Sequence, residues 1–169
     1  MDQPSRQTRF LDLLEQNRGI VHRIAYAYSR EPTEREDLAQ EIVLQLWRSF
    51  DRYDFRRRFS TWMYRVALNV AISHQRSEER RTRVVVGADS SLLETIPDRS
   101  RSPDSADDLR LLRDVVARLN ALDRALIVLY LEGSTHAEIA EVLGISETNA
   151  GTRLGRIRQR LRQELSGTV

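Results

Sequence analysis

The placement of one glycine between two apolar repeats constrains this chain more than any other feature of its sequence. Residues 136–143 have the periodicity of a short amphipathic helix, and Gly144 follows where a tight turn requires a positive φ angle. Ser134 or Thr135 can cap this helix, and Ser146 can cap the longer helix that follows. The two helices share one predicted core: Ile139, Leu143, Ile145, Ala150, Leu154, Ile157 and Leu161. This layout is typical of a helix-turn-helix.

The opposite face of the second helix is predicted to be polar and basic. It presents Ser146, Thr148, Asn149, Thr152, Arg153 and Arg156. In a helix-turn-helix the first turns of the second helix meet base edges in the major groove, and later arginines reach phosphates. Gly151 costs about 1 kcal/mol relative to alanine within a helix, which a close approach of DNA or of a neighbouring helix could justify. We therefore predict a DNA-binding helix; a merely solvated face and a protein-binding helix are the alternatives.

Composition excludes several classes of function. The 169 residues contain no cysteine, so disulfides and thiolate metal sites are impossible. Three histidines are scattered without ligand spacing: His22, His74 and His136. The sequence has no glycine-rich phosphate loop and no nucleophile motif, so we expect neither an enzyme nor a cofactor or metal. It also has no apolar run of membrane-spanning length and no signal pattern, which predicts a cytoplasmic protein.

Charge is distributed unevenly along the chain, although the net charge is only +2. Residues 31–41 contain five acids and one arginine, residues 48–83 ten arginines and four acids, and residues 144–169 five arginines and two acids. All 27 basic residues are arginine, whose guanidinium group suits phosphate and guanine contacts. The two basic zones indicate contacts with a polyanion, and the acidic stretch needs a different partner.

Apolar residues at helical spacing predict two helices in the first part of the chain. One covers residues 10–28, with a break near Gly19. The next begins with a capping box formed by Thr33 and Glu36. Its buried stripe is Leu38, Ile42, Leu46 and Phe50.

A charged loop over residues 51–58 separates these helices from a third. Ser60 or Thr61 can cap this helix, which is predicted over residues 62–75. Its inward positions are Trp62, Val66, Ala67, Val70 and Ala71. The third helix completes an α-helical bundle.

The chain is thus predicted to be all-α, with two small helical domains joined by a flexible linker. The first domain covers residues 8–80 and the helix-turn-helix domain residues 108–165. The linker, residues 81–107, is rich in serine and charge and has too few apolar residues to fold alone.

Three segments resemble one known family. Residues 37–47 resemble the region 2.2 helix of bacterial RNA polymerase sigma factors, residues 59–69 the start of region 2.4, and residues 132–156 region 4.2. Two such domains with little between them are similar to the extracytoplasmic-function (ECF) group of the sigma-70 family. The resemblance covers about 10–78 and 108–164.

The resemblance implies three sets of functional residues. Contact with the β′ clamp coiled coil of core RNA polymerase falls to Asp37, Gln40, Glu41 and Trp47. Contact with the −10 element falls to Arg52, Tyr53, Phe55, Arg56, Arg57, Arg58, Arg65, Asn69 and Arg76. Contact with the −35 element falls to the polar residues of the second helix that are named above, from Ser146 to Arg156. The chain departs from the family pattern at Ser73, where the family commonly has aspartate, and at residues 149–152, where Asn-Ala-Gly-Thr replaces a frequent Thr-Val-Lys-Ser. These departures imply preferences for the −10 and −35 sequences that differ from the family norm.

As a member of this group, the chain would direct promoter recognition, DNA melting and transcription initiation. Its partners would be core RNA polymerase (the β′ coiled coil and the β flap), promoter DNA and an anti-sigma factor. In the loop over residues 51–58, arginines would hold a separated strand while Tyr53 or Phe55 stacks an unpaired base. The alternatives are a stand-alone helix-turn-helix regulator that dimerises through its first domain and a nucleic-acid-processing enzyme.

Overall fold

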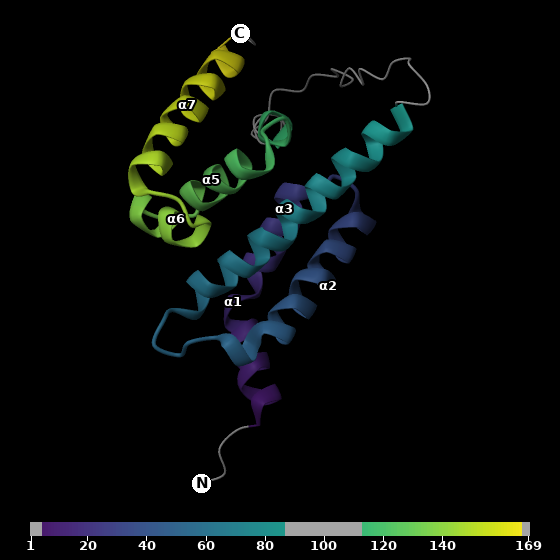
Figure 1. The fold of residues 1–169 in the computed structure, drawn as a ribbon, viewed down its shortest axis with the longest axis vertical. Helices are drawn as coiled ribbons and strands as arrows, with labels where there is room; N and C mark the ends of the chain where they lie inside the picture. The colour runs from purple at the N-terminus through teal and green to yellow at the C-terminus, as the bar shows by residue number, and fades with distance from the viewer. Residues whose placement is uncertain (1–4, 87–112, 167–169) are drawn as a thin grey trace, which may run out of the picture.

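The computed structural model describes residues 5–86 and 113–166, and the regular elements in these ranges are helices (Figure 1). They include α1 (Arg6–Tyr28), α2 (Pro32–Ser49), the 3-10 turn η1 (Phe50–Arg52), α3 (Phe59–Val86), α5 (Ala121–Leu131), α6 (His136–Leu143) and α7 (Glu147–Ser166), and residues 113–117 are helical as well. The all-α prediction is confirmed. Of the predicted linker, residues 87–107 lie outside the described residues, and residues 81–86 belong to α3.

The first domain is a bundle in which α1, α2 and α3 each pack against the other two. The predicted stripe of α2 is confirmed, because Leu38, Ile42 and Leu46 are fully buried. Helix α1 runs without a break through Gly19, so the predicted interruption is wrong. The next two residues, Ile20 and Val21, are buried in the bundle, and this packing outweighs the low helix propensity of one glycine.

The predicted starts of α2 and α3 are also corrected. Helix α2 begins at Pro32, which suits the first helical position because it has no N–H to leave unpaired. Thr33 therefore lies inside the helix and forms no capping box with Glu36. Helix α3 begins at the buried residue Phe59, so Ser60 and Thr61 lie inside the helix and do not cap its start, and the helix continues eleven residues past the predicted end at Gln75.

The second domain contains the predicted helix-turn-helix. Helix α5 ends before Gly133, and Gly144 ends α6, both with positive φ angles of 82° and 67°. Thr135 caps α6 in a capping box with Glu138, whose pKa is lowered by the hydrogen bonds that it accepts from the Thr135 backbone N–H and hydroxyl. Ser146 caps α7 by accepting a hydrogen bond from the Asn149 N–H at 3.1 Å.

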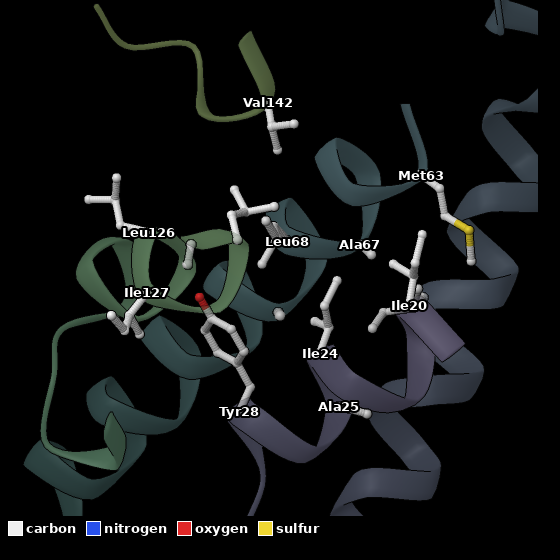
Figure 2. Close-up of a cluster of buried hydrophobic side chains, with 14 of the residues drawn as sticks. Ile20, Ile24, Ala25, Tyr28, Met63, Ala67, Leu68, Leu126, Ile127 and Val142 are labelled. Carbon is white, nitrogen blue, oxygen red and sulfur yellow. The ribbon is translucent and has the colours of Figure 1, made fainter. Parts of the chain in front are cut away.

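The two domains pack against each other and share one hydrophobic core. Helices α5 and α6 lie on α3, and α5 also contacts α1. Side chains of both domains meet there: Ile24, Tyr28 and Leu68 from the first domain with Leu126, Ile127 and Val142 from the second (Figure 2). The second domain therefore buries part of the first in the described arrangement.

A buried polar joint closes this interface at the end of α1. The Tyr28 hydroxyl donates a hydrogen bond of 2.7 Å to the Ala121 carbonyl. The guanidinium group of Arg124 lies 5.2 Å from the Tyr28 ring and donates to the Ala27 carbonyl at 3.3 Å. Arg124 is only 6% exposed and also donates to two carbonyls of its own domain. Burial raises the pKa of Tyr28 and lowers the pKa of Arg124.

The raised pKa of Tyr28 predicts a loss of stability at alkaline pH. The unfolded chain releases this proton near the ordinary value of 10, whereas the folded chain holds it to higher pH. The Tyr28 contribution is complete below about pH 10 and declines above it by up to about 1.4 kcal/mol per pH unit. Urea unfolding measured from about pH 9 to pH 11.5 should show a shallower decline for Tyr28→Phe. Equal declines in both chains would contradict the prediction.

Candidate functional surfaces

The outer face of α2 carries the predicted polymerase-binding residues. Asp37, Gln40 and Glu41 are exposed, because the buried stripe of the helix points the opposite way. Within the described residues, neither carboxylate forms an ion pair. Trp47 differs from the other three: it is half-buried, and its ring meets Phe10 edge-on at 5.1 Å between centroids.

A groove of about 810 Å³ runs beside this face, between α1 and α2. Gln40 and Trp47 line it, together with Leu11 and Leu44, which are 50% and 45% exposed. Sequence reasoning missed these two leucines. The signal was present in α2, since Leu44 follows Gln40 by four residues and so continues its helical face. Unpaired carboxylates beside exposed leucines suit a partner that is both basic and apolar.

The loop between η1 and α3 is built around an aromatic cluster. Tyr53 is 8% exposed and packs on Phe50, Phe59 and Trp62 at 5.1–6.1 Å between ring centroids. Its hydroxyl donates a 2.6 Å hydrogen bond to the Arg57 carbonyl, and burial raises its pKa. Tyr53 is therefore a core residue that shapes the loop, and the structure does not place it as an open stacking surface.

Phe55 is the exposed aromatic residue of this loop. It is 53% exposed, and the guanidinium of Arg9 lies 4.3 Å from its ring centroid. Phe55 can thus stack a planar group without unfolding of the cluster beneath it.

The loop arginines fall into two groups. Arg57 forms an ion pair with Glu141 of α6 at 3.0 Å, and Arg58 lies 3.7 Å from Glu138. Arg52 and Arg56 are exposed, and no ion pair joins them to another part of the described structure. On α3, three further exposed residues lie at intervals that favour one face: Arg65, Asn69 and Arg76.

The predicted face of α7 is only partly free. Thr148, Asn149, Thr152 and Arg156 are exposed. Arg153 instead turns toward α5, where it forms a part-buried ion pair with Asp123 at 2.8 Å. Ser146 accepts the capping hydrogen bond described above.

One residue beside this face was missed. The imidazole of His136, at the start of α6, faces the position that a Cβ atom of Gly151 in α7 would occupy. The low helix propensity of Gly151 draws attention to this position in the sequence, but a Cβ atom there would lie at an ordinary contact distance from the ring.

Other kinds of site are not supported by the described part of the chain. It holds no group of three or more histidine, cysteine, aspartate or glutamate side chains placed to bind a metal ion. None of its helices combines the length and the apolarity needed to cross a membrane.

Comparisons with known proteins agree on one family. Residues 13–81 match the family sigma-70 region 2, and residues 109–161 match sigma-70, region 4. The chain is 32% identical to the ECF RNA polymerase sigma factor SigL of Mycobacterium tuberculosis over 84% of this chain and 80% of SigL. It is 32% identical to the RNA polymerase sigma factor CarQ of Myxococcus xanthus over 94% and 90%, and 28% identical to the ECF sigma factor SigW of Bacillus subtilis over 94% and 90%.

Solved structures share the fold. The sigma factor RpoE in complex with the anti-sigma factor NepR from Bartonella quintana gives a TM-score of 0.72 over 94% of this chain and 97% of that one, at 21% identity. CnrH in complex with the cytosolic domain of CnrY gives 0.69 over 98% and 92%, at 23% identity. Sigma factors are DNA-binding regulatory subunits of RNA polymerase. With both sigma-70 regions present in order, the chain belongs to the ECF group of the sigma-70 family and directs promoter recognition in transcription initiation.

Proposed function

We propose that the chain divides its work between three surfaces: the α1–α2 edge binds core RNA polymerase, the loop before α3 and the face of α3 hold the opened −10 element, and α7 binds the −35 duplex. The observation that supports this division is the separation of charge. Free carboxylates border an apolar groove on one edge, whereas free arginines lie on the loop and on α3. The carboxylates favour a basic protein surface, and the arginines favour a polyanion such as DNA. The two partners therefore bind at different surfaces of the chain.

On the polymerase side, Asp37, Gln40 and Glu41 supply charge and hydrogen bonds, and Leu11 and Leu44 supply apolar contact. The fitting partner is a basic helix pair such as the β′ clamp coiled coil. Trp47 lines the groove, packed against Phe10 and against the Arg6 guanidinium, which lies 3.9 Å from its ring centroid. The β flap would be the second contact on polymerase, through the helix-turn-helix domain.

On the −10 side, the exposed arginines of the loop and of α3 bind the phosphates of a separated strand. Phe55 stacks one unpaired base, which offsets the stacking lost on opening. This capture requires no ATP, because binding energy alone moves the equilibrium toward the open strand. The aromatic cluster around Tyr53 keeps the loop in one shape.

The role of Phe55 predicts a defect in strand opening. Phe55→Ala should slow open-complex formation on a mapped promoter by roughly tenfold, because stacking of one base contributes about 1–3 kcal/mol. Stopped-flow fluorescence of a labelled −10 base measures the rate. Tyr53→Phe is the matched control: it keeps the buried ring, removes only the hydroxyl and should leave the opening rate within twofold. An unchanged rate in Phe55→Ala would remove the stacking role.

On the −35 side, the exposed residues of α7 read the duplex: Thr148, Asn149, Thr152 and Arg156. Arg153 can join them only after its ion pair with Asp123 is broken. We propose residues 8–80 and 108–165 as the two functional domains.

The sigma factors RpoE and CnrH are each solved with a bound regulator, the anti-sigma factor NepR and the cytosolic domain of CnrY. By analogy, this chain would be held inactive by an anti-sigma factor in the cytoplasm. Its activity would need no cofactor and no catalysis of its own.

Run-off transcription tests the proposed function. Core RNA polymerase free of other sigma factors is mixed with the purified chain and a pool of genomic fragments, and the transcript starts are mapped. We expect starts downstream of one shared two-part sequence. A transcript yield no higher than that of core polymerase alone would overturn the proposal.

A further inference from the structure

His136 occupies a fixed place at the start of the helix-turn-helix. It follows the capping residue Thr135, whose hydroxyl accepts a 3.2 Å hydrogen bond from the Glu138 N–H while Glu138 accepts one of 2.8 Å from the Thr135 N–H. This pair of hydrogen bonds sets the direction of the first turn of α6. The His136 side chain is exposed and makes no hydrogen bond or ion pair within the described residues.

The imidazole ring lies on the side of α7 to which a side chain at position 151 would point. A Cβ atom added to Gly151 would be 3.4 Å from His136 Nδ1 and 3.5 Å from Cε1. Alanine would therefore just touch the ring, and a longer side chain would compete with it for the same space. Gly155, one turn later, has no atom within 4 Å of the equivalent position. Of these two glycines, only Gly151 has a neighbour that a longer side chain would meet.

This ring stands beside the residues proposed to read DNA. Thr148 and Thr152 are exposed and lie three residues before and one residue after Gly151. When the first turns of a recognition helix enter the major groove, the preceding helix crosses the DNA backbone. An imidazole at its first residue would then lie near the phosphates, and either ring nitrogen that carries hydrogen can donate to one of them.

We propose that His136 binds a DNA phosphate at the −35 element and that a small residue at position 151 is needed to leave its ring in place. The inference rests on the proposed −35 function of α7. It assigns a DNA contact to a residue outside the recognition helix, and it accounts for the absence of a long side chain at position 151.

The test measures binding of holoenzyme to a duplex that carries the −35 element of a mapped promoter and ends before its −10 element. His136→Phe keeps a ring over Gly151 but cannot donate a hydrogen bond, and it should weaken binding about three- to tenfold. The loss should be similar on every −35 sequence, because phosphates carry no base identity. His136→Gln keeps an N–H donor and should bind within twofold of the original chain.

Gly151→Gln tests the coupling between the two positions. It should weaken binding as much as His136→Phe, and the double variant should bind no more weakly than either single variant. Gly151→Ala and Gly155→Ala are controls that improve helix propensity and should bind normally.

Two results would overturn the inference alone: normal binding by His136→Phe, or additive losses in the double variant. If the original holoenzyme fails to select any −35 sequence, the proposed function itself is wrong and the inference falls with it.

Discussion

A chain carrying Asp37→Arg together with Glu41→Arg is expected to fold normally and to lose its association with core RNA polymerase. Both carboxylates are exposed on α2 and form no ion pair within the described residues, so their removal breaks no contact of the fold. On the proposed interface, each would be replaced by a charge of the same sign as the partner surface. Like charges brought together in an interface cost several kcal/mol, which corresponds to a loss of at least about a hundredfold in affinity.

Pull-down of the chain by immobilised core polymerase measures this effect, and circular dichroism checks the fold. The matched control is Asp12→Arg with Glu31→Arg, which makes the same change of net charge at two exposed acids, one on α1 and one just before α2, outside the α2 face that carries Asp37 and Glu41. It should retain association within a fewfold. Normal association of the α2 variant would exclude the α1–α2 edge as the polymerase site. An equal loss in the control would attribute the effect to net charge alone.

The second large effect is expected from Arg124→Met. This change removes the donor to the Ala27 carbonyl of the first domain and to the carbonyls of Ala117 and Leu119 in the second. Buried carbonyls left without a partner cost about 1–3 kcal/mol each, partly recovered by water, so we expect a net loss of about 2–4 kcal/mol. For a chain of this size, that lowers the melting temperature by roughly 5–15 °C. Small-angle scattering should also show a larger radius of gyration.

Arg30→Met is the control at the same interface. Arg30 lies 3.9 Å from Asp114, and the two side chains are 67% and 42% exposed. An exposed pair of this kind contributes about 0–1 kcal/mol, so the melting temperature should hardly move. If Arg124→Met melts like the original chain, the polar joint does not hold the domains together.

The helix-turn-helix was predictable because its signals are local. Gly144 with a positive φ and the caps at Thr135 and Ser146 depend on residues within four positions of one another. The stripe of α2 was predictable for the same reason. The start of α2 was missed because Pro32 and Thr33 both favour a helix start, and proline at the first position prevailed.

Features that depend on distant parts of the chain could not be read from the sequence. Arg124 looks like a surface residue, yet it is buried against Tyr28, which is 96 positions earlier. Arg153 has the spacing of a DNA contact, but Asp123 of α5 holds it. Tyr53 and Phe55 are two aromatic residues in one loop, and only tertiary packing decides that the first is buried and the second exposed.

The contact of α6 with the loop before α3 sets an order for strand capture on the proposed function. Arg57 and Arg58 already have carboxylates as neighbours, and a phosphate reaches them only by displacing Glu141 and Glu138. Each exchange gains only the difference between the attraction of an arginine to phosphate and its attraction to the carboxylate. Within the described residues, Arg52 and Arg56 have no ion pair to break before they bind a phosphate. A separated strand is therefore expected to contact Arg52 and Arg56 first. The second domain then moves away from the loop as Arg57 and Arg58 exchange the carboxylates of α6 for phosphates.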